Sequence, residues 1–139
     1  MFSKIKIKKS KLDYFRRMAR KHYPLEIEAY LLGHVKSVNE ILITDVVYPK
    51  TYKKQTKVEV CWNANEYCEL KKRAQESEKR IVGDIHSHPK YDAILSETDY
   101  EGMLTEVMLV GGICSVIKGK TKVLFWTPSS ALPCEIVYI

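Results

Sequence analysis

The residues with the clearest chemical potential lie in the segment HSHPKYDAILSETD, residues 86–99. In this segment His86 and His88 are followed, after seven residues, by Ser96 and then by Asp99. Two imidazoles and a carboxylate are ligands that zinc takes in catalytic sites, where a fourth position stays open. Water in that position is acidified to a pKa of about 7, which makes it a nucleophile at neutral pH. The segment therefore predicts a zinc site made of His86, His88 and Asp99 in a metal-dependent hydrolase.

The spacing of these side chains lets them meet. His86 and His88 lie two residues apart at the end of an expected strand over residues 80–86, so both point to the same side. Ser96 and Asp99 lie three apart at an expected helix start, so they share one side of its first turn. Taken alone, Ser96 and Asp99 match a helix cap, and the two histidines match a loop pair without metal. The complete set favours the metal site.

A hydrolytic site of this kind also needs a base that takes the proton from the attacking water. Glu26 and Glu28 are the candidates, because both interrupt the otherwise apolar segment PLEIEAYLLG. The residues alone do not choose between the two. Asp84 shares the strand phase of His86, which makes it a candidate to orient that imidazole. Asp92 does not fit the H-x-H-x-D-H spacing of another class of metal sites.

The elements that must position these residues follow from hydrophobic periodicity and turn signals. Strands are expected at residues 2–8, 26–35, 41–48, 58–62, 80–86, 113–117, 121–126 and 135–139. Helices are expected at residues 11–22 and 63–77 and from Ser96 onward, with caps at Ser10, Asn63 and Ser96. The third helix is expected to bury an apolar face of Tyr100, Met103, Leu104, Val107 and Met108. Residues 49–57 read as a lysine-rich loop, and the whole order indicates an α/β fold with a curved mixed sheet and flanking helices.

Composition sets limits on the class of protein. A chain of 139 residues, with 45% hydrophobic and 29% charged residues, fits a single globular domain over residues 1–139. No apolar stretch is long enough to span a bilayer, and the basic start lacks the apolar core of a signal peptide. We therefore expect a cytoplasmic protein without a membrane partner.

The net charge of +6 raises the alternative of a nucleic-acid-binding module. Lysines cluster at the start of the chain and again in residues 50–57. No RNA-binding aromatic motif or zinc-finger spacing accompanies this charge. A solvated basic face is the favoured interpretation, and a nucleic-acid partner is not expected.

Together these residues resemble the JAMM, or MPN-plus, family of JAB-domain metalloproteases. The signature of that family is an upstream glutamate followed by H-x-H, seven residues and S-x-x-D. The chain fills it with His86, His88, Ser96 and Asp99, and Pro89 fits the usual HSHP. The upstream segment is similar to the family's P-x-E-x-x-G-x-L-x-G, with Pro24, Glu26, Ala29, Leu31 and Gly33. Ala29 stands where a glycine is common, and the resemblance extends over about residues 24–126.

The resemblance implies a cytidine-deaminase-like JAB/MPN fold, a curved mixed sheet flanked by helices, with one zinc ion per chain. It selects Glu26 over Glu28 as the catalytic base and gives Ser96 the task of stabilising the oxyanion. It implies cleavage after the C-terminal tail of ubiquitin or a ubiquitin-like protein, with the tail added along a sheet edge. The run Gly83-Asp84-Ile85-His86 resembles minimal prokaryotic members.

Two other functions stay open on the same fold. One is hydrolysis of short peptides or of an amino acid on a sulfur-carrier tail, which would use the same five residues. The other is a non-catalytic MPN scaffold, although scaffolds of this kind usually lack a metal ligand.

Overall fold

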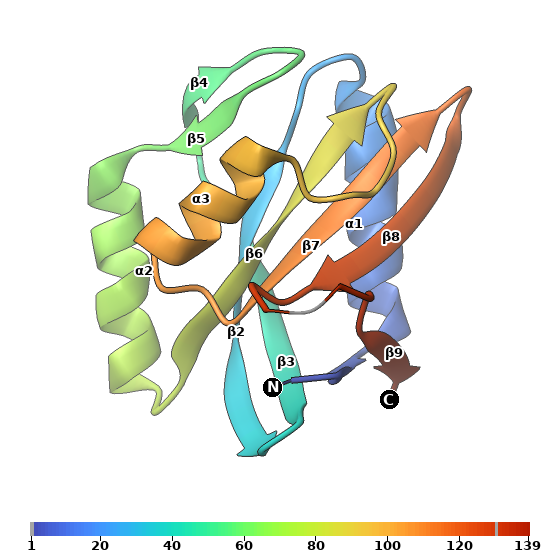
Figure 1. Cartoon of the computed structure of the whole chain (residues 1–139). Helices are drawn as coiled ribbons and strands as arrows, with labels where there is room; N and C mark the ends of the chain where they lie inside the picture. Colours follow the sequence, from blue (N-terminus) through green and yellow to red (C-terminus); the bar gives the residue numbers. More distant parts are fainter. Residues whose placement is uncertain (1, 130) are drawn as a thin grey trace.

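The computed structural model describes residues 2–129 and 131–139. Within these residues the chain forms a seven-stranded mixed sheet, a two-stranded hairpin and three helices (Figure 1). In chain order the elements are β1 (Lys4–Ile7), α1 (Lys9–His22), β2 (Glu28–Ser37), β3 (Glu40–Val47), β4 (Tyr52–Gln55), β5 (Val60–Trp62), α2 (Ala64–Glu76), β6 (Arg80–Pro89), α3 (Glu97–Thr105), β7 (Val110–Ile117), β8 (Lys120–Trp126) and β9 (Glu135–Tyr138).

The strand order of the large sheet is β8-β7-β6-β2-β3-β1-β9. Strand β1 runs parallel to β3 and β9, β6 runs parallel to β7, and the other neighbours are antiparallel. The parallel pair β6 and β7 is joined through α3, because parallel neighbours need a long crossover connection. This connection carries the segment from Ser96 to Asp99 back over the sheet beside the end of β6.

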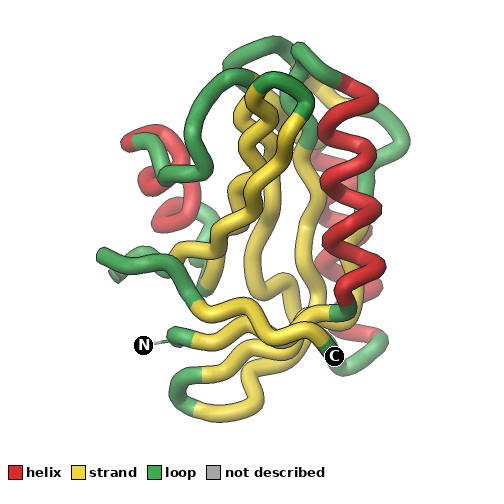
Figure 2. The backbone as a smooth tube through the Cα atoms, turned by 90° about the vertical axis from the view of Figure 1, so that its right-hand side faces the viewer, coloured by secondary structure: helices red, strands yellow, loops and turns green. Residues whose placement is uncertain are grey.

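The two faces of the sheet are covered differently. Figure 2 shows the curved sheet between α1 on one side and the short α3 on the other. Alternate strand residues pack under α1 in the larger core, which includes Ile5, Ile7, Leu12, Phe15, Leu31, Ile85 and Phe125. The opposite face packs against α2, α3 and β5 in a smaller cluster that includes Tyr30, Leu32, Trp62, Leu70 and Met103. The candidate site lies on this second face.

Two glycines let neighbouring elements approach closely. A Cβ atom at Gly83 in β6 would collide with the backbone of Val110 in β7. At Gly111 in β7 a Cβ atom would lie 3.0 Å from Sδ of Met103 in α3. Gly83 therefore lets β6 and β7 pair closely, and Gly111 lets Met103 of α3 pack on β7, which is the arrangement that the site requires.

The expected strands are present, and the structure differs from expectation in residues 49–57 and at the end of β6. Residues 49–57 are not only a loop, because they contain β4, which pairs with β5 in an antiparallel hairpin. Strand β6 extends to Pro89, so that His88 lies within the strand and not after it.

The helices differ from expectation at their ends. Helix α1 starts at Lys9, so Ser10 lies inside it and is not a cap, and Asn63 before α2 makes no side-chain cap bond. Helix α3 ends at Thr105 and buries only Met103. The expected apolar face is therefore largely wrong: Met108 is buried beyond the helix, but Tyr100, Leu104 and Val107 are exposed. No helix in the described part of the chain has the length and apolar character to cross a membrane.

Candidate metal centre

Strand β6 carries the two histidines on the face away from α1. Because alternate residues of a strand point the same way, His86 and His88 lie side by side, each only 8% exposed. Ser87 between them points to the other side and joins β6 to the segment before β2. Its backbone N–H donates to the carbonyl of Ile27, and its Oγ accepts from the N–H of Ile27, both at 2.9 Å. These two bonds connect the strand segment that carries both histidines to Ile27, the residue after Glu26.

Ser96 and Asp99 form a reciprocal cap at the start of α3. The N–H of Asp99 donates to Oγ of Ser96 at 3.0 Å, and the N–H of Ser96 donates to Oδ2 of Asp99 at 3.0 Å. The cap and the metal site are thus not alternatives. The cap fixes the Asp99 carboxylate so that its oxygens also face the two histidines.

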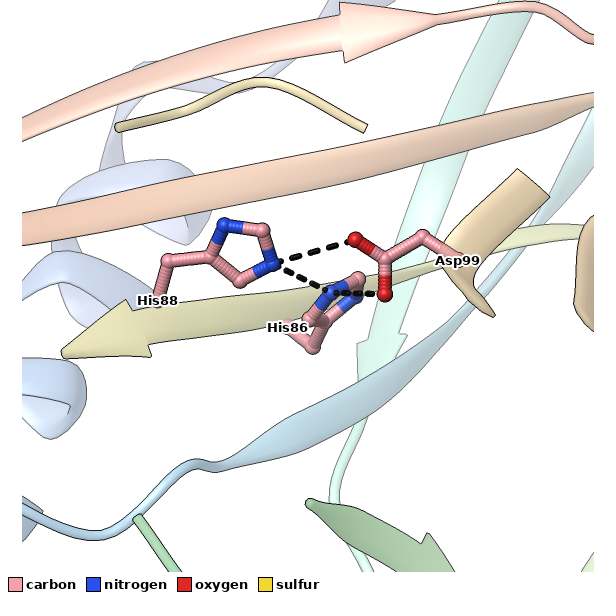
Figure 3. A group of neighbouring side chains, drawn as sticks. All are labelled: His86, His88 and Asp99. Carbon is pink, nitrogen blue, oxygen red and sulfur yellow. Dashed lines mark hydrogen bonds and ion pairs between the residues drawn. The ribbon is translucent and has the colours of Figure 1, made fainter. Parts of the chain in front are cut away.

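The three predicted metal ligands converge on one point (Figure 3). Nε2 of His86 lies 3.1 Å from Nε2 of His88 and 3.0 Å from Oδ1 of Asp99, and Nε2 of His88 lies 3.1 Å from Oδ2 of Asp99. Ligand atoms about 2.0–2.1 Å from a tetrahedral ion are separated by about 3.3 Å. The donor set and its spacing therefore fit a zinc ion.

The second ring nitrogen of each histidine has its own partner. Nδ1 of His88 lies 2.9 Å from the carbonyl oxygen of Asp92, so Nδ1–H donates there and Nε2 is left as the metal ligand. Nδ1 of His86 lies 3.7 Å from Oδ2 of Asp84, at ion-pair distance and in the direction that the shared strand phase predicts. Asp92 thus orients the His88 ring through its backbone carbonyl, a role that the spacing of its side chain did not predict.

The electrostatics favour an ionised Asp99. Burial alone would raise the pKa of its carboxyl, but hydrogen bonds with His86, His88 and the N–H of Ser96 outweigh burial and lower that pKa strongly. An ionised carboxylate is the form that binds a metal.

Glu26 lies just before β2 and is 7% exposed. The β4–β5 hairpin holds its backbone: the N–H of Glu26 donates to the carbonyl of Thr56 at 2.8 Å, and Nε2 of Gln55 donates to the carbonyl of Glu26 at 3.0 Å. Burial raises the pKa of the Glu26 carboxyl, although nearby His86 and His88 act in the opposite direction. A raised pKa suits a carboxylate that must take up and return a proton near neutral pH.

Glu28, which the residues alone left as an alternative base, has a different environment. It is paired with His86 in the β2–β6 register, and burial together with Asp84 raises the pKa of its carboxyl well above the ordinary value. Its backbone is held by Tyr52, whose hydroxyl contacts both the N–H and the carbonyl, and by Nε1 of Trp62. The contacts of Tyr52 could not be predicted, because residues 49–57 read as a loop.

A cavity of about 460 Å³ adjoins the candidate metal centre, and two of the three converging side chains, His86 and Asp99, line it. Glu26, Glu28, His86 and Asp99 all line it, and β5, α2 and α3 form its other walls. Glu26 is thus beside the candidate metal centre, in contact with space that a substrate can enter.

Comparison with known proteins gives the same family as the motif. The family model described as prokaryotic homologs of the JAB domain matches residues 8–129. No curated protein sequence is significantly similar to the chain.

Solved structures share the fold at low sequence identity. Protein DSY2949 of Desulfitobacterium hafniense is 19% identical, with a TM-score of 0.72 over 97% of this chain and 92% of that chain. A protein of Salinibacter ruber is 23% identical, with a TM-score of 0.63 over 96% and 92%. The JAB1/MPN domain protein AF2198 of Archaeoglobus fulgidus is 16% identical, with a TM-score of 0.60 over 96% and 98%. These likenesses establish a mixed α/β JAB/MPN fold.

Proposed function

Because the chain belongs to the family of prokaryotic homologs of the JAB domain, we propose that it is a zinc-dependent peptidase or isopeptidase. Its substrate is a bond that follows the C-terminal tail of ubiquitin or of a ubiquitin-like protein. The observation that carries this proposal is the convergence of His86, His88 and Asp99, with their ligand atoms within 4.8 Å of one another beside the buried Glu26.

The residues divide the chemistry between them. When bound by His86, His88 and Asp99, zinc supplies a Lewis acid for the scissile carbonyl. Glu26 accepts a proton from the attacking water as the new C–O bond forms, and it returns this proton to the leaving amine as the C–N bond breaks. The products are a carboxylate and a free amine.

Ser96 is the proposed oxyanion donor. Its Oγ already accepts a hydrogen bond from the N–H of Asp99, so its own O–H proton is free to point elsewhere. A hydroxyl placed beside a metal ligand can stabilise the charge that develops on the carbonyl oxygen.

The β4–β5 hairpin is the proposed docking edge for the extended tail. In the described residues β5 pairs with β4 alone, and residues 58–62 line the cavity consecutively. An extended peptide can add to such an edge through backbone hydrogen bonds. Short peptides and sulfur-carrier tails would use the same edge and the same five residues, so a substrate panel must separate these classes.

The test compares metal content with cleavage. Wild type, Glu26→Gln, His88→Ala and the control His22→Ala, which changes a histidine outside the site, are checked for folding by circular dichroism and assayed for zinc. We expect about one zinc per chain in wild type, Glu26→Gln and His22→Ala, and none in His88→Ala. We also expect wild type and His22→Ala to cleave ubiquitin-like conjugates, and Glu26→Gln and His88→Ala to leave them uncleaved. Normal cleavage by Glu26→Gln would exclude Glu26 as the base. If wild type held no zinc even after zinc was added, the non-catalytic scaffold would be favoured over the hydrolase.

A further inference from the structure

The cavity beside the candidate metal centre has an unusual charge for this protein. The chain has 23 lysine and arginine residues against 17 acidic ones. None of those basic residues lines the cavity, whereas six carboxylates do: Glu26, Glu28, Glu59, Asp84, Asp99 and Glu106. A divalent metal ion at the three ligands would offset the charge of only two of these carboxylates. A cleft of one sign with low-dielectric walls concentrates the opposite charge.

The carboxylates are placed by the pairing of two central strands. Glu28 is opposite His86, and Tyr30 is opposite Asp84, in the β2–β6 register, so all four side chains share one face. At the far end of the cavity the hydroxyl of Tyr30 donates to Oε1 of Glu106 at 3.1 Å. The acidic lining therefore runs from the metal centre into the space under α3.

An aromatic wall accompanies the charge. The ring of Tyr30 lies 4.8 Å, centroid to centroid, from both the Trp62 and the Tyr67 rings, and all three residues line the cavity. Aromatic faces and edges pack against the methylene stems of lysine and arginine, and their faces attract the cationic heads.

Glu26, one of these six residues, differs from the others in having no side-chain partner among the described residues. It is more than nine-tenths buried, it lines the cavity, and no described residue hydrogen-bonds or ion-pairs with its carboxylate. A buried carboxylate without a protein partner is costly unless something that enters the cavity compensates it. Glu59, by contrast, is exposed and already pairs with Lys54.

We propose that this cavity binds a lysine or arginine side chain of the substrate close to the scissile amide. The proposal rests on the proposed function, because it assigns the substrate class of that same site. It makes the cavity a specificity pocket, in which Glu28 and Glu106 contact the cationic head and the three aromatic rings contact its stem.

The experiment measures binding without requiring cleavage. Fluorescein-labelled peptides with an N-methylated, uncleavable central amide carry arginine, glutamine or glutamate at each position that flanks this amide. Their affinities for the zinc-loaded protein are measured by fluorescence anisotropy at 0.15 M salt. We expect arginine to bind about tenfold more tightly than glutamine at one position, and glutamate to bind most weakly.

Variants assign the preference to the cavity. We expect Glu28→Gln and Glu106→Gln each to reduce the ratio of arginine to glutamine affinity several-fold. Glu101→Gln, an equal charge change at an exposed residue of α3 outside the cavity lining, should leave this ratio unchanged. Thermal unfolding checks that each variant is folded, and Glu106 is exposed enough to tolerate the change. Equal binding of all peptides, or an equal loss in Glu101→Gln, would overturn the proposal.

Cleavage assays keep the two proposals apart. If wild type cleaves ubiquitin-like conjugates but binds the arginine and glutamine peptides equally, the specificity pocket is wrong and the proposed function stands. If arginine is preferred but no conjugate or peptide is cleaved, the pocket stands and the proposed hydrolysis fails.

Discussion

At the residue scale, Ser96 combines a structural and a proposed chemical task in one hydroxyl group. Its oxygen accepts from the N–H of Asp99 and completes the cap of α3. The same cap returns a hydrogen bond from the N–H of Ser96 to the Asp99 carboxylate, which faces both histidines. Removal of the hydroxyl therefore acts on helix stability and on the reaction separately.

Ser96→Ala is expected to reduce kcat by about 10²–10³ while zinc content stays near that of wild type, because one oxyanion donor is lost. The lost cap should also lower the free energy of unfolding by about 1 kcal/mol. Ser96→Thr keeps both the hydroxyl and the cap and should retain most activity. Steady-state kinetics, zinc analysis and urea unfolding measure the three quantities, and a fully active Ser96→Ala would exclude the oxyanion role.

Ser87 is expected to position the base without touching substrate. Ser87→Ala removes the acceptor of the buried N–H of Ile27, which costs about 1–3 kcal/mol and loosens the segment that carries Glu26. We expect kcat to fall while zinc binding persists, and Ser87→Thr to restore both rate and stability. A loss of zinc that parallels the loss of rate would show that Ser87 instead supports His86 and His88.

The motif residues could be brought together from the sequence because regular elements fix their directions. A strand places His86 and His88 on one side, and a helix start places Ser96 and Asp99 together. The contact from His88 to the carbonyl of Asp92 could not be predicted in this way, since every residue has a carbonyl and only the loop conformation selects one.

At the element scale, the errors of sequence interpretation have a common cause. Leu104 and Val107 fit an apolar helical period but are exposed, because α3 turns only Met103 toward the sheet and ends at Thr105, before Val107. Strand β4 could not be predicted because its lysine-rich sequence lacks the alternation of apolar and polar residues. A hairpin that packs outside the main sheet does not need this alternation. In both elements tertiary packing outweighs local pattern.

The turn between α2 and β6 offers an element-scale prediction. Nζ of Lys79 lies 2.7 Å from Oδ2 of Asp45 in β3. Partial burial would raise the pKa of the Asp45 carboxyl, but hydrogen bonds from Lys79 and Thr44 outweigh it and lower that pKa below 3.8. The pair is therefore stabilising above pH 3.8, and this contribution is lost as the pH falls through the lowered pKa.

Lys79→Met is expected to lower the free energy of unfolding by about 0.5–1 kcal/mol at pH 7, a modest value because both side chains are partly exposed. The difference from wild type should vanish on acidification below the pKa of Asp45. Lys72→Met, on the exposed surface of α2, serves as the control and should show no such pH dependence. Urea unfolding across pH 2.5–7 measures it, and a constant difference at all pH values would contradict the ion-pair explanation.

At the scale of the whole molecule, the fold separates stability from chemistry. The larger core lies between α1 and the sheet, and the candidate metal centre lies on the opposite face, where the cavity interrupts the packing. The metal ligands come from β6 and α3 and contribute nothing to the core under α1. The fold should therefore persist without metal, although α3 then loses one of its links to the sheet.

Metal removal is accordingly expected to lower the unfolding temperature without unfolding the protein. Free zinc at a hundredfold excess over its dissociation constant stabilises the folded state by about 2.7 kcal/mol, and a chelator removes this contribution. Calorimetry should show a downward shift of several degrees for chelated wild type, unchanged far-ultraviolet circular dichroism at 25 °C, and recovery when zinc is added back. His88→Ala should melt at the same temperature with and without chelator, because its site cannot hold the ion. If chelation shifted His88→Ala as much as wild type, the stabilising metal would have to bind somewhere other than His86, His88 and Asp99.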